Sequence, residues 1–185
     1  VLGNHDQAVI AGDLLSMSPA IGAATAWTRS ELDAGQLEFL RALPLQVVDE
    51  DRLYVHANAW APGEWAYVSN RLAAARSLLA TPAWLTFCGH VHEPALYHLQ
   101  AGAASHFAPT GGVAIPLSSQ RHWLAIPGSC GQPRDGNPAA ACAWFDTDSR
   151  QLGFLRVPYD HELSAQKIRA AGLPPVFAQR LGEGR

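Results

Sequence analysis

Lysine is almost missing from this chain: Lys167 is the only one among 185 residues, and 13 basic residues face 16 acidic ones. A formal net charge of -3 argues against the broad cationic surface that binds nucleic acid nonspecifically. No apolar run approaches the roughly 18 residues of a transmembrane helix, so we expect no membrane span. The only cysteines are Cys88, Cys130 and Cys142, an odd number without disulfide-framework spacing. This usage predicts a reduced, cytoplasmic compartment.

The chain does contain many turn-forming residues. Its 13 Pro and 16 Gly indicate many turns between short elements, and its length favours one domain. Hydrophobic periodicity and capping signals predict helices at 30–43, 69–79 and 164–171. Strands are predicted at 45–48, 53–56, 84–88, 95–99, 112–117, 122–126, 140–146 and 151–157.

This order of elements, helix–strand units first and a run of strands later, predicts an α/β fold with two β-layers flanked by helices. The turn at 146–149 predicts a hairpin between the last two strands. We assign residues 1–173 to one domain. Residues 174–185 are expected to form a poorly ordered tail.

Three short apolar runs each end on side chains that bind metals. Val1-Leu2-Gly3 precedes Asn4-His5-Asp6 and is interpreted as the end of a buried strand entering a polar loop. Leu53-Tyr54-Val55 precedes His56, and Phe87-Cys88-Gly89 precedes His90-Val91-His92. Imidazole and carbonyl or carboxylate oxygen suit divalent Mn, Fe, Co, Ni and Zn. Loops that leave buried strands can hold such ligands rigidly.

The spacing of His90 and His92 allows two arrangements. On an extended backbone, residues two apart project to the same side. Both rings could then share one centre, or each could face one of two metals about 3.5–4 Å apart. Gly89 would allow the tight bend before them.

Other interpretations remain for single residues. Asn4 alone would be a turn former, and His56 alone would be a core histidine. Cys88 could extend the pair to Cys-x-His-x-His, although a buried strand cysteine is favoured. Trp60 and Trp65 could wall a nucleobase site, although core packing is favoured. The three motifs in this order favour a metal site.

The three segments resemble the later motifs of the calcineurin-like metallophosphoesterases: Gly-Asn-His-Asp, a His after a strand, and Gly-His-x-His. The closer resemblance is to small bacterial members related to the diadenosine tetraphosphate hydrolases. Residues 127–136, Pro-Gly-Ser-Cys-Gly-Gln-Pro-Arg-Asp-Gly, are similar to a loop of that family. The resemblance covers nearly all of residues 1–173 and implies a two-sheet αββα sandwich.

Roles follow from this resemblance residue by residue. It implies that Asn4, His56 and His90 ligate one metal and that His92 ligates the other. His5 would be the protonated imidazole near the phosphate and leaving group, oriented by Asp6. Arg134 would bind the phosphate, or pair with Asp135 or another acid.

The opening motifs of the family are not found. No Asp-x-His occurs in the chain, and Gly12-Asp13 follows the first motif, where a loop is expected. The chain therefore resembles a member that lacks its opening βαβα part and is implied to be inactive alone.

The implied parent activity is hydrolysis of a phosphomonoester or phosphodiester at a dinuclear centre of Mn, Fe, Ni, Co or Zn. The partner would be a small phosphorylated substrate, and its class stays open among phosphomonoesters, cyclic nucleotides, phosphodiesters and dinucleoside polyphosphates. The alternative is a catalytically inactive scaffold or binding module on the same fold. Oligomerisation through an exposed sheet is a further expectation.

Overall fold

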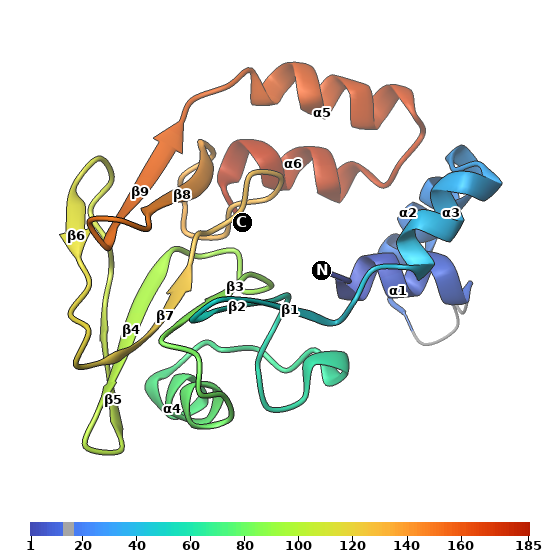
Figure 1. Cartoon of the computed structure of the whole chain (residues 1–185). Helices are drawn as coiled ribbons and strands as arrows, with labels where there is room; N and C mark the ends of the chain where they lie inside the picture. The colour runs from blue at the N-terminus through green and yellow to red at the C-terminus, as the bar shows by residue number, and fades with distance from the viewer. Residues whose placement is uncertain (13–16) are drawn as a thin grey trace.

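Two β-sheets form the centre of the molecule (Figure 1). The computed structural model describes residues 1–12 and 17–185. The larger sheet has six strands, in the order β1 (Gln46–Asp49), β2 (Arg52–Val55), β3 (Leu85–Cys88), β7 (His122–Ile126), β4 (Ala95–Gln100) and β5 (Ala103–Phe107). The smaller sheet has the order β6 (Ala114–Pro116), β9 (Gln151–Val157) and β8 (Ala140–Asp146). The predicted two β-layers are therefore confirmed.

Strand direction differs within the larger sheet. Strands β2, β3 and β7 are parallel neighbours, whereas β1, β4 and β5 are antiparallel to the strands they pair with. The smaller sheet is antiparallel throughout, and β8 and β9 form the predicted hairpin. The parallel centre matters for function because the carboxyl ends of its strands lie along one edge.

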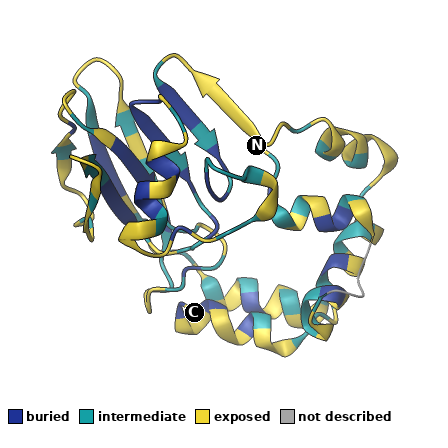
Figure 2. Ribbon diagram, turned by 90° about the horizontal axis from the view of Figure 1, so that it is seen from below, coloured by how far each residue is buried: buried dark blue, intermediate teal, exposed yellow. Residues whose placement is uncertain are grey.

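Both faces of the larger sheet are buried. One face packs against α4 (Arg71–Leu79), with Leu78, Leu124 and Ile126 in the core. The other face packs against the smaller sheet, where Leu96 meets Leu152 and its neighbours. Burial on two sides explains why the central strands are apolar at consecutive positions. Figure 2 shows this buried centre in dark blue.

The remaining helices lie outside this core. They are α1 (Asn4–Ala11), α2 (Pro19–Glu31), α3 (Ala34–Arg41), α5 (His161–Ala170) and α6 (Pro175–Glu183), with a short 3-10 turn at Pro62–Glu64. In Figure 1, α1, α2 and α3 form one group, and α5 and α6 form a pair. That pair is held by Ala165, Ala178 and Leu181. None of the helices in the described part of the chain has the length and apolar character needed to cross a bilayer.

Some sequence predictions are wrong. Val1 to Gly3 form no strand, and the polar segment after them is the start of α1, with Gly3 as its N-cap. The single helix predicted at 30–43 is two helices, because Leu32 is extended and Asp33 caps a new helix through Gln36. The predicted disordered tail contains α6. Strand β5 and helix α2 were not predicted. Gly12 ends α1, while Asp13 lies outside the described residues.

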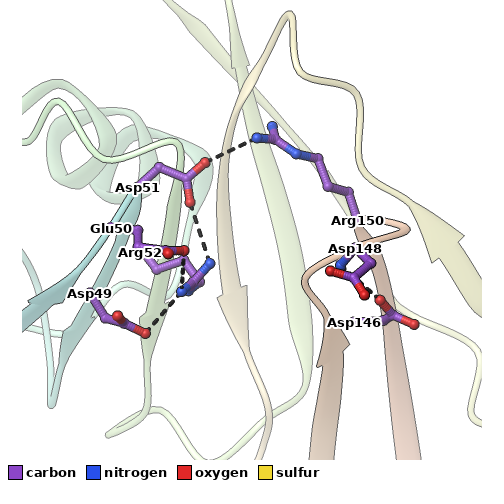
Figure 3. A network of polar contacts seen from close by, with 7 residues as sticks. All are labelled: Asp49, Glu50, Asp51, Arg52, Asp146, Asp148 and Arg150. Carbon is purple, nitrogen blue, oxygen red and sulfur yellow. Dashed lines mark hydrogen bonds and ion pairs between the residues drawn. The ribbon is translucent and has the colours of Figure 1, made fainter.

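Charged side chains connect the two sheets at one end (Figure 3). Arg52 is buried and bonds to Asp49 at 2.9 Å and Glu50 at 2.8 Å. Asp51 contacts Arg150, which lies on the β8–β9 turn, at 3.3 Å. A buried guanidinium needs such partners. The acidic turn between β1 and β2 thus neutralises the charge of Arg52 and holds the β8–β9 hairpin against the larger sheet.

Candidate metal centre

Three loops meet at the carboxyl-end edge of the parallel strands. His56 directly follows β2, His90 follows β3 by two residues, and the loop 127–139 follows β7. Parallel pairing of β2 with β3 aligns Val55 with Cys88, so the two histidines leave the sheet side by side. The His56 carbonyl accepts a hydrogen bond from the Gly89 amide at 2.8 Å. Ligands and catalytic groups in open α/β sheets gather at this edge.

Asn4, His56 and His90 converge on one point. His56 Nε2 lies 2.9 Å from Asn4 Oδ1 and 3.1 Å from His90 Nδ1. A single proton on His56 Nε2 can be donated to only one of these two acceptors, so lone pairs remain directed at a common position. The first two motifs are separated by 52 residues, and the structure brings them into contact, as the metal hypothesis expects.

Residues His90 and His92 both have a left-handed backbone, with φ of 65° and 67°. The predicted extended conformation is therefore wrong, and the bend falls on the histidines themselves rather than on Gly89. Such values are uncommon in residues with a Cβ and persist only where surrounding contacts impose them. The turn is closed by a hydrogen bond from the Val91 amide to the Gly89 carbonyl at 2.7 Å.

His92 is oriented by the loop after β7. Its Nδ1 lies 2.7 Å from the Gln132 carbonyl oxygen. A carbonyl only accepts, so Nδ1 carries the proton and Nε2 keeps its lone pair in the neutral ring. The Arg134 amide donates in turn to the His92 carbonyl at 3.2 Å. This backbone support is typical of a metal-ligating histidine.

The surroundings keep these three imidazoles neutral. Burial lowers the pKa of His56, and burial followed by the charge of Arg134 lowers the pKa of His92. Burial and the neighbouring His56 lower the pKa of His90 to about 4. Neutral imidazole is the form that binds metals.

His5 and Asp6 lie on the first turn of α1, beside Asn4. The Asp6 carboxylate accepts a hydrogen bond from the Gly3 amide at 2.8 Å, which caps the helix. Asp6 therefore has a capping role in this structure, and its orientation of His5 stays a prediction. His5 is exposed and directly follows Asn4 on this turn.

Arg134 lies on the same edge and is half-buried. Its Nη2 donates to Gln132 Oε1 at 3.3 Å. The alternative pairing with Asp135 is wrong, because Asp135 pairs with Arg156. Within residues 1–12 and 17–185, no ion pair engages Arg134, so its guanidinium is available to an anion.

Aromatic rings frame the two inner histidines. Trp65 meets His56 edge-on with ring centroids 5.7 Å apart, and Tyr67 stacks on His90 at 4.1 Å. Trp65 thus belongs to the site, whereas Trp60 packs on the core and stacks with Arg76. Cys88 is a buried strand residue, as favoured, and burial raises its pKa to about 12.

Two contributors were missed from the sequence. Tyr67 belongs to no recognised sequence motif, and the one feature of the sequence that could have identified it is the nearby aromatic residue Trp65. Asn58 is fully buried and bonds to the Ala61 amide at 2.8 Å and to the Ala66 carbonyl at 3.0 Å. It therefore fixes the loop that carries both rings.

The donor set fits one divalent ion. Ligands about 2.1 Å from a shared ion, at octahedral or tetrahedral angles, lie about 3.0–3.4 Å from each other. The distances of 2.9 Å and 3.1 Å from His56 to Asn4 and His90 are close to this spacing. Two imidazoles and an amide oxygen suit a borderline metal. Among the described residues, His, Cys, Asp and Glu side chains alone form no group of three that could hold a metal ion. The proposed site therefore needs the Asn4 oxygen as its third ligand beside His56 and His90.

Comparison with known proteins identifies relatives along the whole chain. No family model matches. An uncharacterized protein, MJ0912, of Methanocaldococcus jannaschii is 30% identical over 190 residues, covering all of this chain and 75% of that protein.

The solved structures that resemble this chain include two crystal structures. A metallophosphoesterase from Sphaerobacter thermophilus has a TM-score of 0.87 and 34% identity, covering all of this chain and 76% of that one. The hypothetical protein PH1004 from Pyrococcus horikoshii OT3 has a TM-score of 0.74 at 18% identity, covering 99% and 71%. The second supports the fold alone.

Proposed function

This chain belongs to the calcineurin-like metallophosphoesterase family, and we propose that its site serves metal-dependent hydrolysis of a phosphate ester. The observation that carries this proposal is the convergence of Asn4, His56 and His90. Family membership implies divalent metal ions. We propose Mn, Fe, Ni, Co or Zn, because imidazole nitrogen and amide oxygen are the donors. The three cysteines are unpaired, which supports a cytoplasmic location.

We propose two metal positions, and this chain supplies more ligands to one of them than to the other. Asn4, His56 and His90 would hold one ion, while His92 would contribute to a second. Divalent ions, when bound, supply electrostatic stabilisation of the charge that develops on phosphate oxygens. A family Asp-x-His and Gly-Asp segment would complete the second position, and no Asp-x-His is present in this sequence.

The remaining site residues act on substrate in this proposal. His5 is exposed and directly follows Asn4, and it would donate a proton to the leaving oxygen. Asp6 supports His5 indirectly, by capping the helix that carries it. Arg134 would bind a phosphate oxygen with its unpaired guanidinium. The substrate is a small phosphate monoester or diester.

Metal titration tests the metal-binding part. We expect one tightly bound Mn²⁺ per chain, because three ligands meet at one position and only His92 marks the other. His90→Ala should lose that ion, while His122→Ala, on β7, should keep it. Two tight sites in the chain, or an unchanged ion in His90→Ala, would contradict this assignment.

Activity needs a completed site. We expect the chain alone to be inactive on an aryl phosphodiester and to gain Mn²⁺-dependent activity when an Asp-x-His and Gly-Asp segment from a relative is appended. Activity that is unaffected by His90→Ala would overturn the proposed site. Metal binding without hydrolysis in the extended protein would instead support the alternative, a binding module on the same fold.

The role of His5 is tested in that extended protein. His5→Ala should lower kcat by about 10²–10⁴, the usual range for general acid catalysis, without lowering metal content. The deficit should shrink for a leaving group acidic enough to depart unprotonated. Equal deficits for good and poor leaving groups would count against proton donation by His5.

A further inference from the structure

A cavity lies beside Arg134 and helix α6. Its volume is about 510 Å³. The side chains around it are Arg134, Val176, Gln179, Arg180, Glu183 and Arg185. Three arginines and one glutamate thus face this cavity in a chain with a formal net charge of -3. Positive charge is concentrated here.

Helix α6 is held firmly against the loop that carries Arg134. The Gly136 amide donates to the Gly184 carbonyl at 2.9 Å. Gly184 has φ of 65°, and a Cβ there would lie 2.6 Å from the Asn137 backbone nitrogen. Such close packing leaves room only for glycine. This backbone contact holds α6, which carries Arg180, against the loop that carries Arg134.

The charges in this cavity are not balanced from within. Glu183 is engaged by Gln179 at 2.8 Å and by Arg185 at 2.5 Å. Neither Arg134 nor Arg180 forms an ion pair with any residue that the structure describes. Two unpaired guanidinium groups around one cavity repel each other, and an anion between them would remove that cost.

Arg134 connects this cavity to the metal centre through a backbone contact. Arg134 bonds through its amide to the carbonyl of His92, at 3.2 Å. Its side chain lines the cavity with Arg180. Arg134 therefore both contacts a proposed metal ligand and lines the cavity with Arg180.

We propose that Arg134 and Arg180 form an anion subsite that binds a further phosphate group of the substrate. The proposal rests on the function proposed above and narrows it to compounds with two or more linked phosphates. A compound with a single phosphate would use the metal centre and Arg134 and leave Arg180 without a partner. Arg180 is thus a specificity-determining residue supplied by α6.

Binding of inorganic tripolyphosphate to the metal-free chain tests this subsite without requiring catalysis. Calorimetry at low salt should show tripolyphosphate binding at least about tenfold tighter than orthophosphate, because its linked phosphate groups can engage Arg134 and Arg180 at the same time. Arg180→Ala should weaken tripolyphosphate binding about tenfold or more. Arg180 is exposed, so this variant should keep the wild-type melting temperature.

Arg169→Ala is the matched control, because it removes the same charge from an exposed arginine on α5 that lies outside the cavity. It should change the affinity by less than about twofold. Equal losses in Arg169→Ala and Arg180→Ala, or orthophosphate binding as tight as tripolyphosphate, would overturn the subsite. His90→Ala should lose the metal ion and keep tripolyphosphate binding, so a failure of the proposed function is seen separately.

Discussion

Most of what the sequence predicts about the site concerns single residues. Asn4, His56 and His90 were predicted to share a metal position, and they meet within hydrogen-bonding distance. Their conformations were not predictable in the same way. The left-handed backbone of His90 and His92 arises from contacts with loops distant in sequence, and no local pattern records those contacts.

The pH dependence of stability reports on His90. Its pKa is about 4 in the folded chain and about 6.5 in an unfolded one. Between these values the unfolded chain binds a proton that the folded chain does not, so stability present above pH 6.5 is lost as the pH falls toward 4. Urea unfolding of the metal-free chain from pH 7.5 to 4.5 measures this loss. His90→Gln should show a shallower decline, and parallel declines would contradict the neutral state of His90.

Asn58 shows how a structural residue supports the site. Asn58→Ala leaves the Ala61 amide and the Ala66 carbonyl without their side-chain partner, in a fully buried place. We expect a loss of about 1–3 kcal/mol in the free energy of unfolding. Denaturant unfolding measures it, and Asn70→Ala, which removes an exposed cap of α4, should cost about 1 kcal/mol. A cost for Asn58→Ala no larger than that of Asn70→Ala would be inconsistent with this role.

At the scale of elements, strands were predicted better than helices. Strands β7, β8 and β9 have the predicted bounds, because consecutive or alternating apolar residues between turn residues identify strands locally. Helix α6 was missed, although Pro175 at its first position and Gly184 just after it are recognised start and stop signals. Its apolar residues Ala178 and Leu181 pack against Ala165 of α5, and its end contacts the 134–137 loop, so tertiary contacts stabilise this short helix.

The loop after β7 depends on one glycine. Gly128 has φ of 95°, and a Cβ there would lie 2.6 Å from Ala141 Cβ and 2.9 Å from Pro94. Gly128→Ala should therefore lower stability by at least about 1–3 kcal/mol and displace the Gln132 carbonyl from His92. Thermal melting checks the first effect, and ring ¹⁵N spectra of His92 check its tautomer.

Gly131→Ala, in the same loop, is the control. A Cβ at Gly131 would have no atom within 4 Å, and the φ of this residue lies outside the left-handed region, so the variant should be tolerated. If both variants behave alike, close packing at Gly128 does not position this loop.

At the scale of the whole molecule, topology assembles the site from pieces that are far apart in sequence. Parallel pairing of β2, β3 and β7 places three loops at one edge. The sequence predicted the two layers from the order of its elements, yet strand order and parallel neighbours follow from long-range packing. The cavity between Arg134 and α6 could not be inferred at all, because it exists only once α6 docks on the loop.

The same topology leaves β1 as an open edge. Within the described part of the chain, strand β1 pairs only with β2, and all four of its residues are exposed (Figure 2). Val47 is 39% and Val48 64% exposed. An apolar edge strand with free backbone groups is a template for pairing with a second chain. We therefore expect the 185-residue chain to self-associate through β1, as the exposed-sheet prediction proposed.

Sedimentation velocity over a range of protein concentrations measures this association. Val48→Lys should shift the chain toward monomer, because a lysine on an edge strand opposes pairing with another edge. Val113→Lys makes the same chemical change at a residue that is 51% exposed and lies outside the strands, so it should leave association unchanged. A wild-type chain that is monomeric at every concentration would rule out the β1 interface. Equal effects of the two variants would indicate that association depends on general surface hydrophobicity rather than on the edge strand β1.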